Sequence, residues 1–386
     1  MRIGINASFL RKLNTGIGQY SKNVIERMVN LKEHKDKKFY LYFEEEGGSN
    51  FIEESDNVIK KILKVPFYKR DDLVKKTTWE KIVLPREVKK DEIDVFFTPF
   101  NSASYFHSIR HVVTLHDVVW KVFEDQYANN FRKKLYFNKT LDMSEKADHL
   151  ITVSRFSKRE ILKYLEVDPN NLTVIRNGVA DYFRYQENKA EIERSIKKTG
   201  LKPGYIFYIG GFEKRKRVDF LIGAFKKIVD NYPNVLEGRK LVIAGELWNH
   251  EDPLITNVKK QIEKHGIEKN VKLLGRVDDQ DRPGLYAGAD LYIFPSIYEG
   301  FGMPVLEAMA AGCPVLASNI PPLAEIAGEA IEFFNPNRED ELIQQTLKLL
   351  SEREKRLELS LKGMERAQGF DWNETAKRTI NVILDS

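Results

Sequence analysis

The chain has 386 residues, 42% of them hydrophobic, with one cysteine and a formal net charge of +5. This length allows about two to three domains, and a single cysteine excludes an internal disulfide framework. No apolar run of about 18 residues is present, and the N-terminus moves directly into a strand-like pattern. We therefore expect a cytoplasmic protein without a membrane-spanning segment.

Strand-like runs alternate with helical patterns along the chain. Each run is short, apolar and rich in β-branched or aromatic residues, which is typical of right-handed βαβ units with mostly parallel sheets. The predicted strands of the first half are residues 2–8, 39–43, 94–99, 111–117, 149–154 and 172–177. Those of the second half are residues 205–210, 240–245, 271–275, 291–296, 314–318 and 330–334.

A glycine-rich loop, residues 14–20, follows the first predicted strand and leads into a helical pattern. Gly16 and Gly18 would let a phosphate or an acceptor approach the backbone closely. A plain turn is the alternative, because a Gly-x-Gly pair alone is weak evidence for a ligand site.

Positive charge is concentrated in residues 57–90. This segment holds eleven Lys and Arg against four acidic residues, a net charge of +7, so the remainder of the chain is at −2. With Phe67, Tyr68 and Trp79 interleaved, it could dock on an anionic bilayer or meet a phosphorylated acceptor. A solvated helix face is the alternative. We expect no nucleic-acid binding, since no recognisable module accompanies the charge.

His116 and Asp117 end the predicted strand 111–117 and are candidates for a site at the carboxyl edge of the sheet. A lone histidine at a strand end is more often structural, which is the competing interpretation.

A polar, charge-dense stretch at residues 181–203 has little strand pattern and follows a turn signal at Asn177-Gly178. We place the domain boundary there and predict an α/β fold of two doubly wound Rossmann-like domains, residues 1–180 and 204–370. Such sheets bind ligands at the carboxyl ends of their strands, so two facing domains would form a deep cleft between them.

Four basic residues follow the first predicted strand of the second domain, within the run Gly210-Gly211-Phe-Glu-Lys-Arg-Lys-Arg217. They would cluster at the carboxyl end of a strand beside a helix N-terminus, where a diphosphate has the charge to match them. An exposed basic turn is the alternative.

Asp279 and Asp281 superficially resemble an acid pair that holds a metal ion. They precede a predicted helix, however, where acidic side chains act as caps. We therefore expect no metal site.

Two carboxylates flank a turn and a helix start between Glu299 and Glu307. Pro304 suits the first helical position, because it lacks an N–H and its φ is already helical. Gly300 and Gly302 would let a ligand approach the backbone, and carboxylates accept hydrogen bonds from sugar hydroxyls. We expect the amides at the helix start to point outward, unpaired, at a positive helix end, namely those of Gly302, Met303 and Val305. Ordinary surface glutamates beside a common turn are the alternative.

The run LYIFPSIYEGFGMPVLEAMAAGCPVLAS, residues 291–318, carries a resemblance to a known family. It is similar, almost residue for residue, to the Glu-x7-Glu region of the large retaining glycosyltransferase family with the GT-B fold, the fourth in the usual sequence classification. The resemblance extends from about residue 2 to residue 384. It implies that the last helix, in residues 371–386, packs back on the N-terminal domain, which would bind the acceptor.

The resemblance also implies a role for each matching residue. Glu299 would lie against the donor sugar and leaving phosphate, Glu307 would bind the nucleotide ribose, and His116 would reach the donor sugar. Glu299, Lys216 and His116 are thus the expected catalytic residues. The other implied donor-binding residues are Arg215, Gly300, Phe301, Gly302, Met303, Pro304, Val305, Gly16, Gly18 and Arg276, the last as a base contact.

One position departs from the family pattern. Many members have an arginine directly after the glycine that ends the first strand of the second domain, and this chain has Gly211 there. Part of the phosphate clamp is therefore missing or supplied differently.

These residues predict glycosyl transfer, with retention at the anomeric carbon, from a nucleoside-diphosphate sugar to a hydroxyl of a saccharide or lipid-linked acceptor. The resemblance is closest to bacterial mannosyl- and rhamnosyl-type transferases of cell-surface polysaccharide assembly, so GDP-mannose is the first choice of donor and a UDP-sugar the second. No cofactor or metal is expected, and the enzyme could lie peripherally on the inner membrane face. The alternatives are a related epimerase or phosphorylase and a catalytically silent sugar-nucleotide-binding scaffold.

Overall fold

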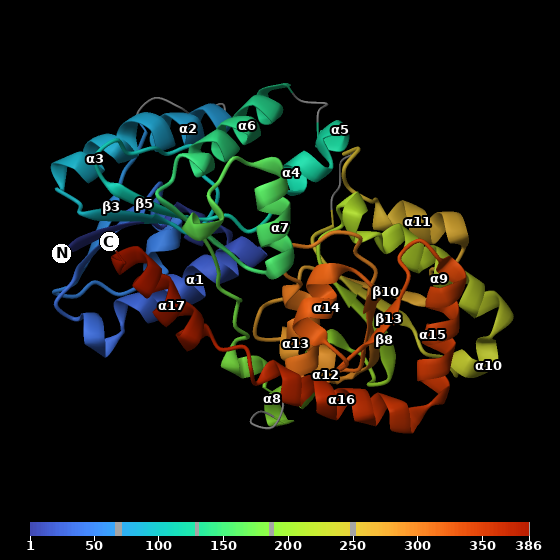
Figure 1. The fold of residues 1–386 in the computed structure, drawn as a ribbon. Helices are drawn as coiled ribbons and strands as arrows, with labels where there is room; N and C mark the ends of the chain where they lie inside the picture. The colour runs from blue at the N-terminus through green and yellow to red at the C-terminus, as the bar shows by residue number, and fades with distance from the viewer. Residues whose placement is uncertain (66–71, 128–130, 185–188, 248–251, 386) are drawn as a thin grey trace. The chain divides into compact units, whose positions relative to one another are not determined.

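The structure, a computed structural model, describes residues 1–65, 72–127, 131–184, 189–247 and 252–385 (Figure 1). Contacts within the chain divide it into two compact units. Unit 1 comprises Met1–Gly178 and Asp371–Ser386, and unit 2 comprises Val179–Phe370. Residues 179–203, which include the predicted boundary region, therefore belong to unit 2.

Unit 1 is built on a sheet of seven parallel strands in the order β3-β2-β1-β4-β5-β6-β7. The order reverses at β1, so the carboxyl ends of β1 and β4 flank the switch point where doubly wound sheets bind ligands. The strands are β1 Arg2–Asn6, β2 Lys38–Phe43, β3 Val58–Ile62, β4 Val95–Thr98, β5 Arg110–Thr114, β6 His149–Thr152 and β7 Leu172–Val174.

Helices cover this sheet and bury an apolar core against it. The α-helices are α1 Gly16–Val29, α2 Asp72–Thr78, α3 Leu84–Lys90, α4 Val119–Val122, α5 Glu124–Tyr127, α6 Phe131–Glu145, α7 Arg155–Tyr164 and α17 Trp372–Leu384. Short helical turns are η1 Ser8–Lys12, η2 Lys32–His34, η3 Glu46–Phe51, η5 Pro169–Asn171 and the π-helical η4 Trp79–Val83, which joins α2 to α3.

The basic segment 57–90 is not one helix face. It begins with β3, an edge strand that pairs only with β2 among the described strands, and continues through α2, η4 and α3. Lysines on an edge strand disfavour pairing with a further chain, which gives Lys60 and Lys61 a structural reason. Phe67, Tyr68, Lys69 and Arg70 lie outside the described residues.

Unit 2 repeats the architecture with six parallel strands in the order β10-β9-β8-β11-β12-β13. Its switch point lies between β8 and β11, and the core contains apolar side chains of both. The strands are β8 Tyr205–Ile209, β9 Leu241–Ala244, β10 Val271–Gly275, β11 Ala289–Phe294, β12 Val315–Ser318 and β13 Glu332–Phe334.

The helices of unit 2 include α8, which packs on α12 and thereby ties the predicted boundary region to this unit. The elements are η6 Asp181–Phe183, α8 Lys189–Thr199, η8 Lys214–Lys216, α9 Val218–Asn231, α10 Pro233–Leu236, α11 Val258–His265, α12 Arg282–Ala287, α13 Met303–Ala310, α14 Pro321–Ala327, α15 Glu339–Ser351 and α16 Arg353–Ala367. The predicted α/β architecture of two parallel sheets is confirmed.

The last helix, α17, belongs to unit 1 and packs on α1 (Figure 1). Its first residue, Trp372, is buried, and its ring centroid lies 6.0 Å from that of Tyr20. Asp371 caps the helix by accepting a hydrogen bond from the Asn373 amide. The C-terminal segment thus completes the core of the N-terminal sheet, as the family resemblance implies.

Among the residues described, no helix combines the length and the apolar character that a bilayer crossing requires.

Candidate functional site

The switch point of unit 2 brings together the basic run 214–217 and the segment that contains Glu299. The turn η8 follows β8, and residues 296–299 follow β11, the neighbouring strand. The two segments are joined through their backbones, because the Ile297 amide donates to the Arg215 carbonyl at 2.9 Å. The Ser296 hydroxyl contacts the same carbonyl oxygen at 3.3 Å.

Glu299 contacts two cations where these two segments meet. Lys216 Nζ is 2.5 Å from Glu299 Oε1, and Arg215 Nη1 is 3.4 Å from the same oxygen. Arg215 Nη1 also donates to the Tyr298 carbonyl at 2.9 Å. Lys216 and Glu299 are only 9% and 7% exposed, so water screens this pair weakly.

The neighbouring cations decide the charge of Glu299. Burial acts to raise the pKa of this carboxyl, but Lys216 and Arg215 outweigh burial, and its pKa lies below the usual value. Glu299 is therefore ionised at neutral pH. The residues 213–217 together with Glu299 contain four cations and two carboxylates, a net charge of +2 that suits an anionic ligand.

At Gly211, the position that departs from the family pattern, the neighbouring side chain is Glu213. The carboxylate of Glu213 lies over this glycine, so a Cβ placed at Gly211 would meet Glu213 Oε2. Glu213 Oε1 is 3.9 Å from Arg215 Nη2. An arginine at position 211 would require Glu213 to move.

Glu307 occupies a second buried cluster, on α13. Its Oε2 accepts hydrogen bonds from the guanidinium of Arg282 and, at 3.0 Å, from the hydroxyl of Tyr286, both on α12. Burial raises the pKa of Glu307, and Arg282 and Tyr286 offset that rise only in part. Sequence reasoning missed both partners, which lie 25 and 21 residues before Glu307.

The start of α13 differs in one respect from the prediction. Gly302 is the N-cap, with φ of 112°, and a Cβ there would meet Leu323, so only glycine fits. Pro304 is the second residue of α13, one place after the predicted first position, and still lies in the first turn. The Val305 amide, however, donates to the Gly302 carbonyl at 3.0 Å and is not unpaired, because the helix starts with a tight i−3 bond.

The remaining residues of this motif are partly structural. Phe301 is buried with its ring centroid 6.1 Å from that of Phe370, and Gly300 is also buried. Met303 and Pro304 are partly exposed at the helix start.

Arg276 follows β10 and lines a hollow together with residues of α8 and the β10–α12 loop. Asp281, at the N-cap position of α12, does not cap the helix, and its carboxylate pairs with Lys198 of α8 instead. Asp279 Oδ1 lies 3.3 Å from Arg282 Nη1. The capping interpretation of Asp281 was therefore wrong, because a cation from another helix competes for the carboxylate. Within the described ranges, no group of three or more His, Cys, Asp or Glu side chains is placed to hold a metal ion.

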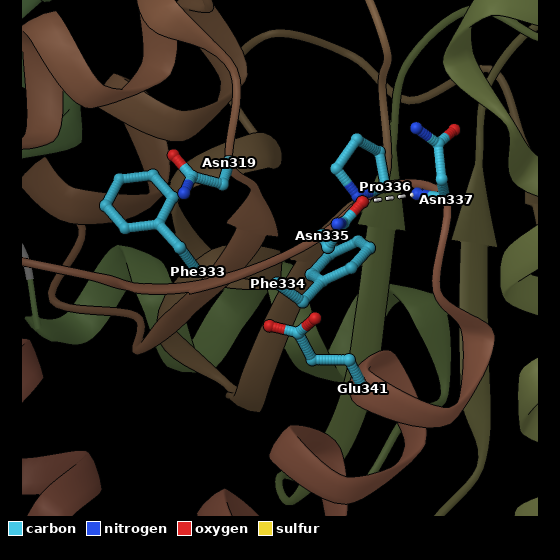
Figure 2. Close-up of a pocket in the computed structure, with 7 residues that line it drawn as sticks. All are labelled: Asn319, Phe333, Phe334, Asn335, Pro336, Asn337 and Glu341. Atoms are coloured by element: carbon cyan, nitrogen blue, oxygen red, sulfur yellow. Dashed lines mark hydrogen bonds between the residues drawn. The ribbon is translucent and has the colours of Figure 1, made fainter.

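A separate hollow lies at the carboxyl ends of β12 and β13 (Figure 2). Figure 2 shows Asn319, Phe333 and Glu341 around it. None of the predicted site residues lines it. Arg217, which follows Lys216, donates from Nη1 to the carbonyl of Pro336 in its wall at 2.8 Å.

In unit 1, the glycine-rich loop uses one of its glycines for packing. The Gly18 amide donates to the Thr15 hydroxyl, the N-cap of α1, at 3.1 Å, and a Cβ at Gly18 would meet the Lys12 carbonyl. Gly18 is therefore explained by the helix start, contrary to the expected ligand approach. A Cβ at Gly16 would meet open space, so this position remains accessible.

His116 follows β5 and is partly exposed. Its Nε2 lies 3.0 Å from the Pro99 carbonyl oxygen, and its ring meets that of Tyr20 edge-on at 4.6 Å. A carbonyl only accepts, so Nε2 carries the proton and Nδ1 keeps its lone pair. Burial lowers the pKa of His116 despite Pro99 and Asp117, so the ring is neutral at pH 7.

An aromatic and basic cluster at the switch point of unit 1 was not predicted. Phe9, after β1, and Phe100, after β4, have ring centroids 4.8 Å apart. Lys76 Nζ lies 5.7 Å from the Phe100 centroid, 6.0 Å from Phe9 and 5.1 Å from Tyr136, and Lys12 Nζ lies 5.9 Å from Phe9. Each pair is within cation–π distance. The sequence does contain a signal for this cluster, because Phe9 and Phe100 each directly follow a predicted strand.

Two family models match this chain. The model described as Glycosyltransferase Family 4 matches residues 18–181, and the model described as Glycosyl transferases group 1 matches residues 189–366. The first match covers most of unit 1, and the second covers most of unit 2.

Known proteins agree with these matches. The O-antigen chain mannosyltransferase B of Escherichia coli is 28% identical over 386 residues, with 95% of each chain covered. Among solved structures, a sucrose-phosphate synthase from Thermosynechococcus elongatus superposes with a TM-score of 0.77 at 17% identity, covering 99% of this chain and 98% of the other. HepE of Anabaena, solved in complex with UDP and glucose, superposes with a TM-score of 0.73 at 17% identity over 99% and 98% of the two chains.

Proposed function

Since this chain belongs to the GT-B glycosyltransferases of the family four type, we propose that it transfers a sugar from a nucleoside diphosphate to an acceptor hydroxyl, with retention at the anomeric carbon. The observation that carries the proposal is the cluster of Lys216, Arg215 and Glu299 at the switch point of unit 2. This cluster is mostly buried, has a net positive charge and lies at the carboxyl edge of the sheet, so it is suited to the diphosphate of a sugar nucleotide.

In the proposed reaction, the bond between the anomeric carbon and the diphosphate oxygen breaks, and a bond to the acceptor oxygen forms. Positive charge develops on the sugar, and negative charge develops on the departing diphosphate. Lys216 and Arg215 stabilise that negative charge, which is the larger part of the catalytic effect. The acceptor proton passes to an oxygen of the leaving phosphate.

Glu299 has two tasks in this proposal. Its ionised carboxylate holds Lys216 and Arg215 in place before the donor arrives, and it accepts hydrogen bonds from hydroxyls of the donor sugar. Glu307 accepts from the ribose through Oε1, because Oε2 is engaged by Arg282 and Tyr286. Arg276 contacts the base, and the backbone from Gly300 to Pro304 lines the diphosphate.

His116 contributes from unit 1. With Nε2 held by Pro99, the neutral ring offers Nδ1 as an acceptor for a hydroxyl of the donor sugar or of the acceptor. The placement of unit 1 and unit 2 across a shared cleft is part of the proposal.

For the donor sugar, we infer mannose carried by GDP as the first choice. The support is the 28% identity to an O-antigen chain mannosyltransferase over nearly the whole of both chains. A UDP-sugar is the second choice, supported by the fold shared with HepE in complex with UDP and glucose.

The acceptor is proposed to be a saccharide, free or lipid-linked, in surface polysaccharide synthesis. Phe9 and Phe100 supply apolar ring faces, and Lys12 and Lys76 supply charge for a phosphate on the acceptor. With a lipid-linked acceptor, the enzyme would work at the inner membrane face, where the basic segment 57–90 favours anionic lipid.

The decisive experiment combines binding with turnover. Thermal shift against GDP-, UDP-, ADP- and TDP-sugars should show stabilisation by one nucleotide class, since a ligand bound only by the folded state raises stability. Nuclear magnetic resonance of the product should then show the same anomeric configuration as the donor. Binding without nucleotide release for any acceptor would instead support a silent scaffold, and donor formation from a glycoside and free nucleoside diphosphate or phosphate would support a phosphorylase.

A further inference from the structure

Helix α6 of unit 1 exposes two large apolar side chains. Phe131 is 77% exposed and Leu135 is 61% exposed. Residues four apart lie on the same side of a helix, so the two form one apolar patch. Tyr136 faces the other way, because it is buried and its hydroxyl donates to Glu80 of η4 at 3.0 Å.

The surroundings of this patch are basic. From Phe131 to Leu141 the sequence FRKKLYFNKTL contains no acidic residue. Arg132 is exposed, and Lys139 is partly exposed. Lys134 is paired with Glu124 at 2.7 Å and is left out of the patch.

The neighbouring helical turn η4 also exposes a basic and an apolar side chain. Figure 1 shows α6 running beside α2, which continues into η4, and the Tyr136–Glu80 hydrogen bond ties α6 to η4. On η4, Lys81 is exposed and Ile82 is 44% exposed. We call Phe131, Arg132, Leu135 and Lys139 the α6 face.

Unit 2 offers an internal contrast. On α16, Leu357 and Leu361 are also four residues apart and are 54% and 64% exposed. Their helix, however, mixes charges, since Glu358 pairs with Lys355 at 3.2 Å and with Lys362 at 2.6 Å. An apolar pair among paired charges has no preference for an anionic surface, whereas the α6 pair lies among cations.

We propose that the α6 face docks on an anionic lipid bilayer. Phe131 and Leu135 enter the boundary between headgroups and acyl chains, and Arg132 and Lys139 meet lipid phosphates. The inference rests on the proposed function only in that a lipid-linked acceptor makes membrane attachment useful. It adds residues outside the basic segment 57–90 and a specific apolar insertion.

Flotation of the full chain with vesicles tests the face directly. The protein should float with vesicles of phosphatidylcholine and phosphatidylglycerol but not with phosphatidylcholine alone. The double variant Phe131→Ser/Leu135→Ser should bind at least about tenfold more weakly, because it loses the inserted area. Lys139→Gln should weaken binding about fivefold at low salt.

The matched control is Leu357→Ser/Leu361→Ser on α16, which should float like the wild type. All four side chains are exposed, so both double variants should keep the wild-type melting temperature. Equal loss in the two double variants, or unchanged flotation of the α6 variant, would overturn the proposal. So would a wild-type dimer that becomes monomeric in the α6 variant, because a second copy would then cover the face.

Nucleotide release with a water-soluble acceptor separates this inference from the proposed function. The α6 variant should turn over that acceptor like the wild type. If the wild type floats with anionic vesicles but releases no nucleotide from any donor, the docking face stands and the proposed reaction fails.

Discussion

Glu299 and Glu307 are both buried in unit 2, and their pKa values move in opposite directions. Glu299 has two cations on one oxygen, and its pKa lies below the usual value. Glu307 has one cation and one hydroxyl, and burial holds its pKa above the usual value. Burial alone therefore does not fix the charge of a carboxylate, because the number of adjacent cations decides which effect is larger.

The difference also separates two kinds of ligand contact. In the proposed donor complex, a diphosphate at Lys216 and Arg215 would compete with a carboxylate that is already ionised and in contact with both cations. A ribose hydroxyl would donate to Glu307, whose ionised form is only partly stabilised by Arg282 and Tyr286. We therefore expect ligand binding near Glu299 to depend mainly on charge and ligand binding at Glu307 to depend mainly on hydrogen bonding.

The largest expected effect follows from removing the central cation. Lys216→Met should lower kcat/KM about 100- to 1000-fold, as expected when one preorganised donor to the transition-state charge is lost. Steady-state nucleotide release measures it. Lys214→Met removes an exposed lysine of the same turn and should change kcat/KM less than about threefold. Comparable losses in both variants would mean that general basic charge, and not the contact with Glu299, supports the reaction.

Neutral isosteres should divide the two glutamates kinetically. Glu299→Gln should lower kcat about 100-fold, because Lys216 and Arg215 lose the charge that positions them. Glu307→Gln should raise the donor KM about tenfold with a smaller change in kcat, since a ribose contact is made equally in ground and transition states. A fall in kcat for Glu307→Gln as deep as that for Glu299→Gln would contradict the division.

The pH dependence of stability should show opposite signs. The lowered pKa of Glu299 means that its ionised form contributes stability above pH 4.5, which is lost as pH falls below that value. The raised pKa of Glu307 means that its ionisation costs stability, and this cost grows as pH rises from 4.5. Denaturant unfolding of wild type and the two Gln variants, from about pH 3.5 to pH 7, compares the slopes. Parallel slopes would show that the two carboxyls do not differ in this way.

The smallest expected effect tests how much the Tyr286 hydroxyl contributes to the Glu307 cluster. Tyr286→Phe removes only the hydroxyl that donates to Glu307 at 3.0 Å. We expect a loss of about 1 to 2 kcal/mol in the free energy of unfolding and a rise in donor KM of about threefold or less. Tyr292→Phe, which removes the hydroxyl on β11 that donates to the Ile209 carbonyl, is the control and should leave the donor KM unchanged. An unchanged donor KM and melting temperature in Tyr286→Phe would show that Arg282 alone holds Glu307.

Much of the fold could be predicted from the sequence, because parallel strands buried on both faces are continuous apolar runs. All twelve predicted strands are present, with ends within three residues of the prediction. The prediction ran too far mainly at carboxyl ends, as at Leu115–Asp117 and Ile175–Asn177, because a buried apolar residue, Leu115 or Ile175, directly follows the last strand residue. β3 was missed, since an edge strand with two lysines lacks the apolar pattern.

The candidate site was only partly predictable. Lys216 and Glu299 could be matched to a motif, but their contact depends on the strand order β8-β11, which joins segments 83 residues apart. Arg282 and Tyr286 carry no motif and are recognised only when α12 packs beside α13. The sequence also does not show which of two possible partners a side chain takes. Asp281, for example, pairs with Lys198 instead of capping its helix.

Because α17 belongs to unit 1, unit 2 can complete its folding before unit 1 does. Trp372, Ile380 and Ile383 are buried in unit 1, although they follow the whole of unit 2 in the chain. Unit 2 is continuous and has its whole sequence by residue 370, whereas the Tyr20 side of α1 stays uncovered until α17 has been added. A chain truncated after residue 370 and released from the ribosome should therefore carry a protease-resistant second half and a protease-sensitive first half.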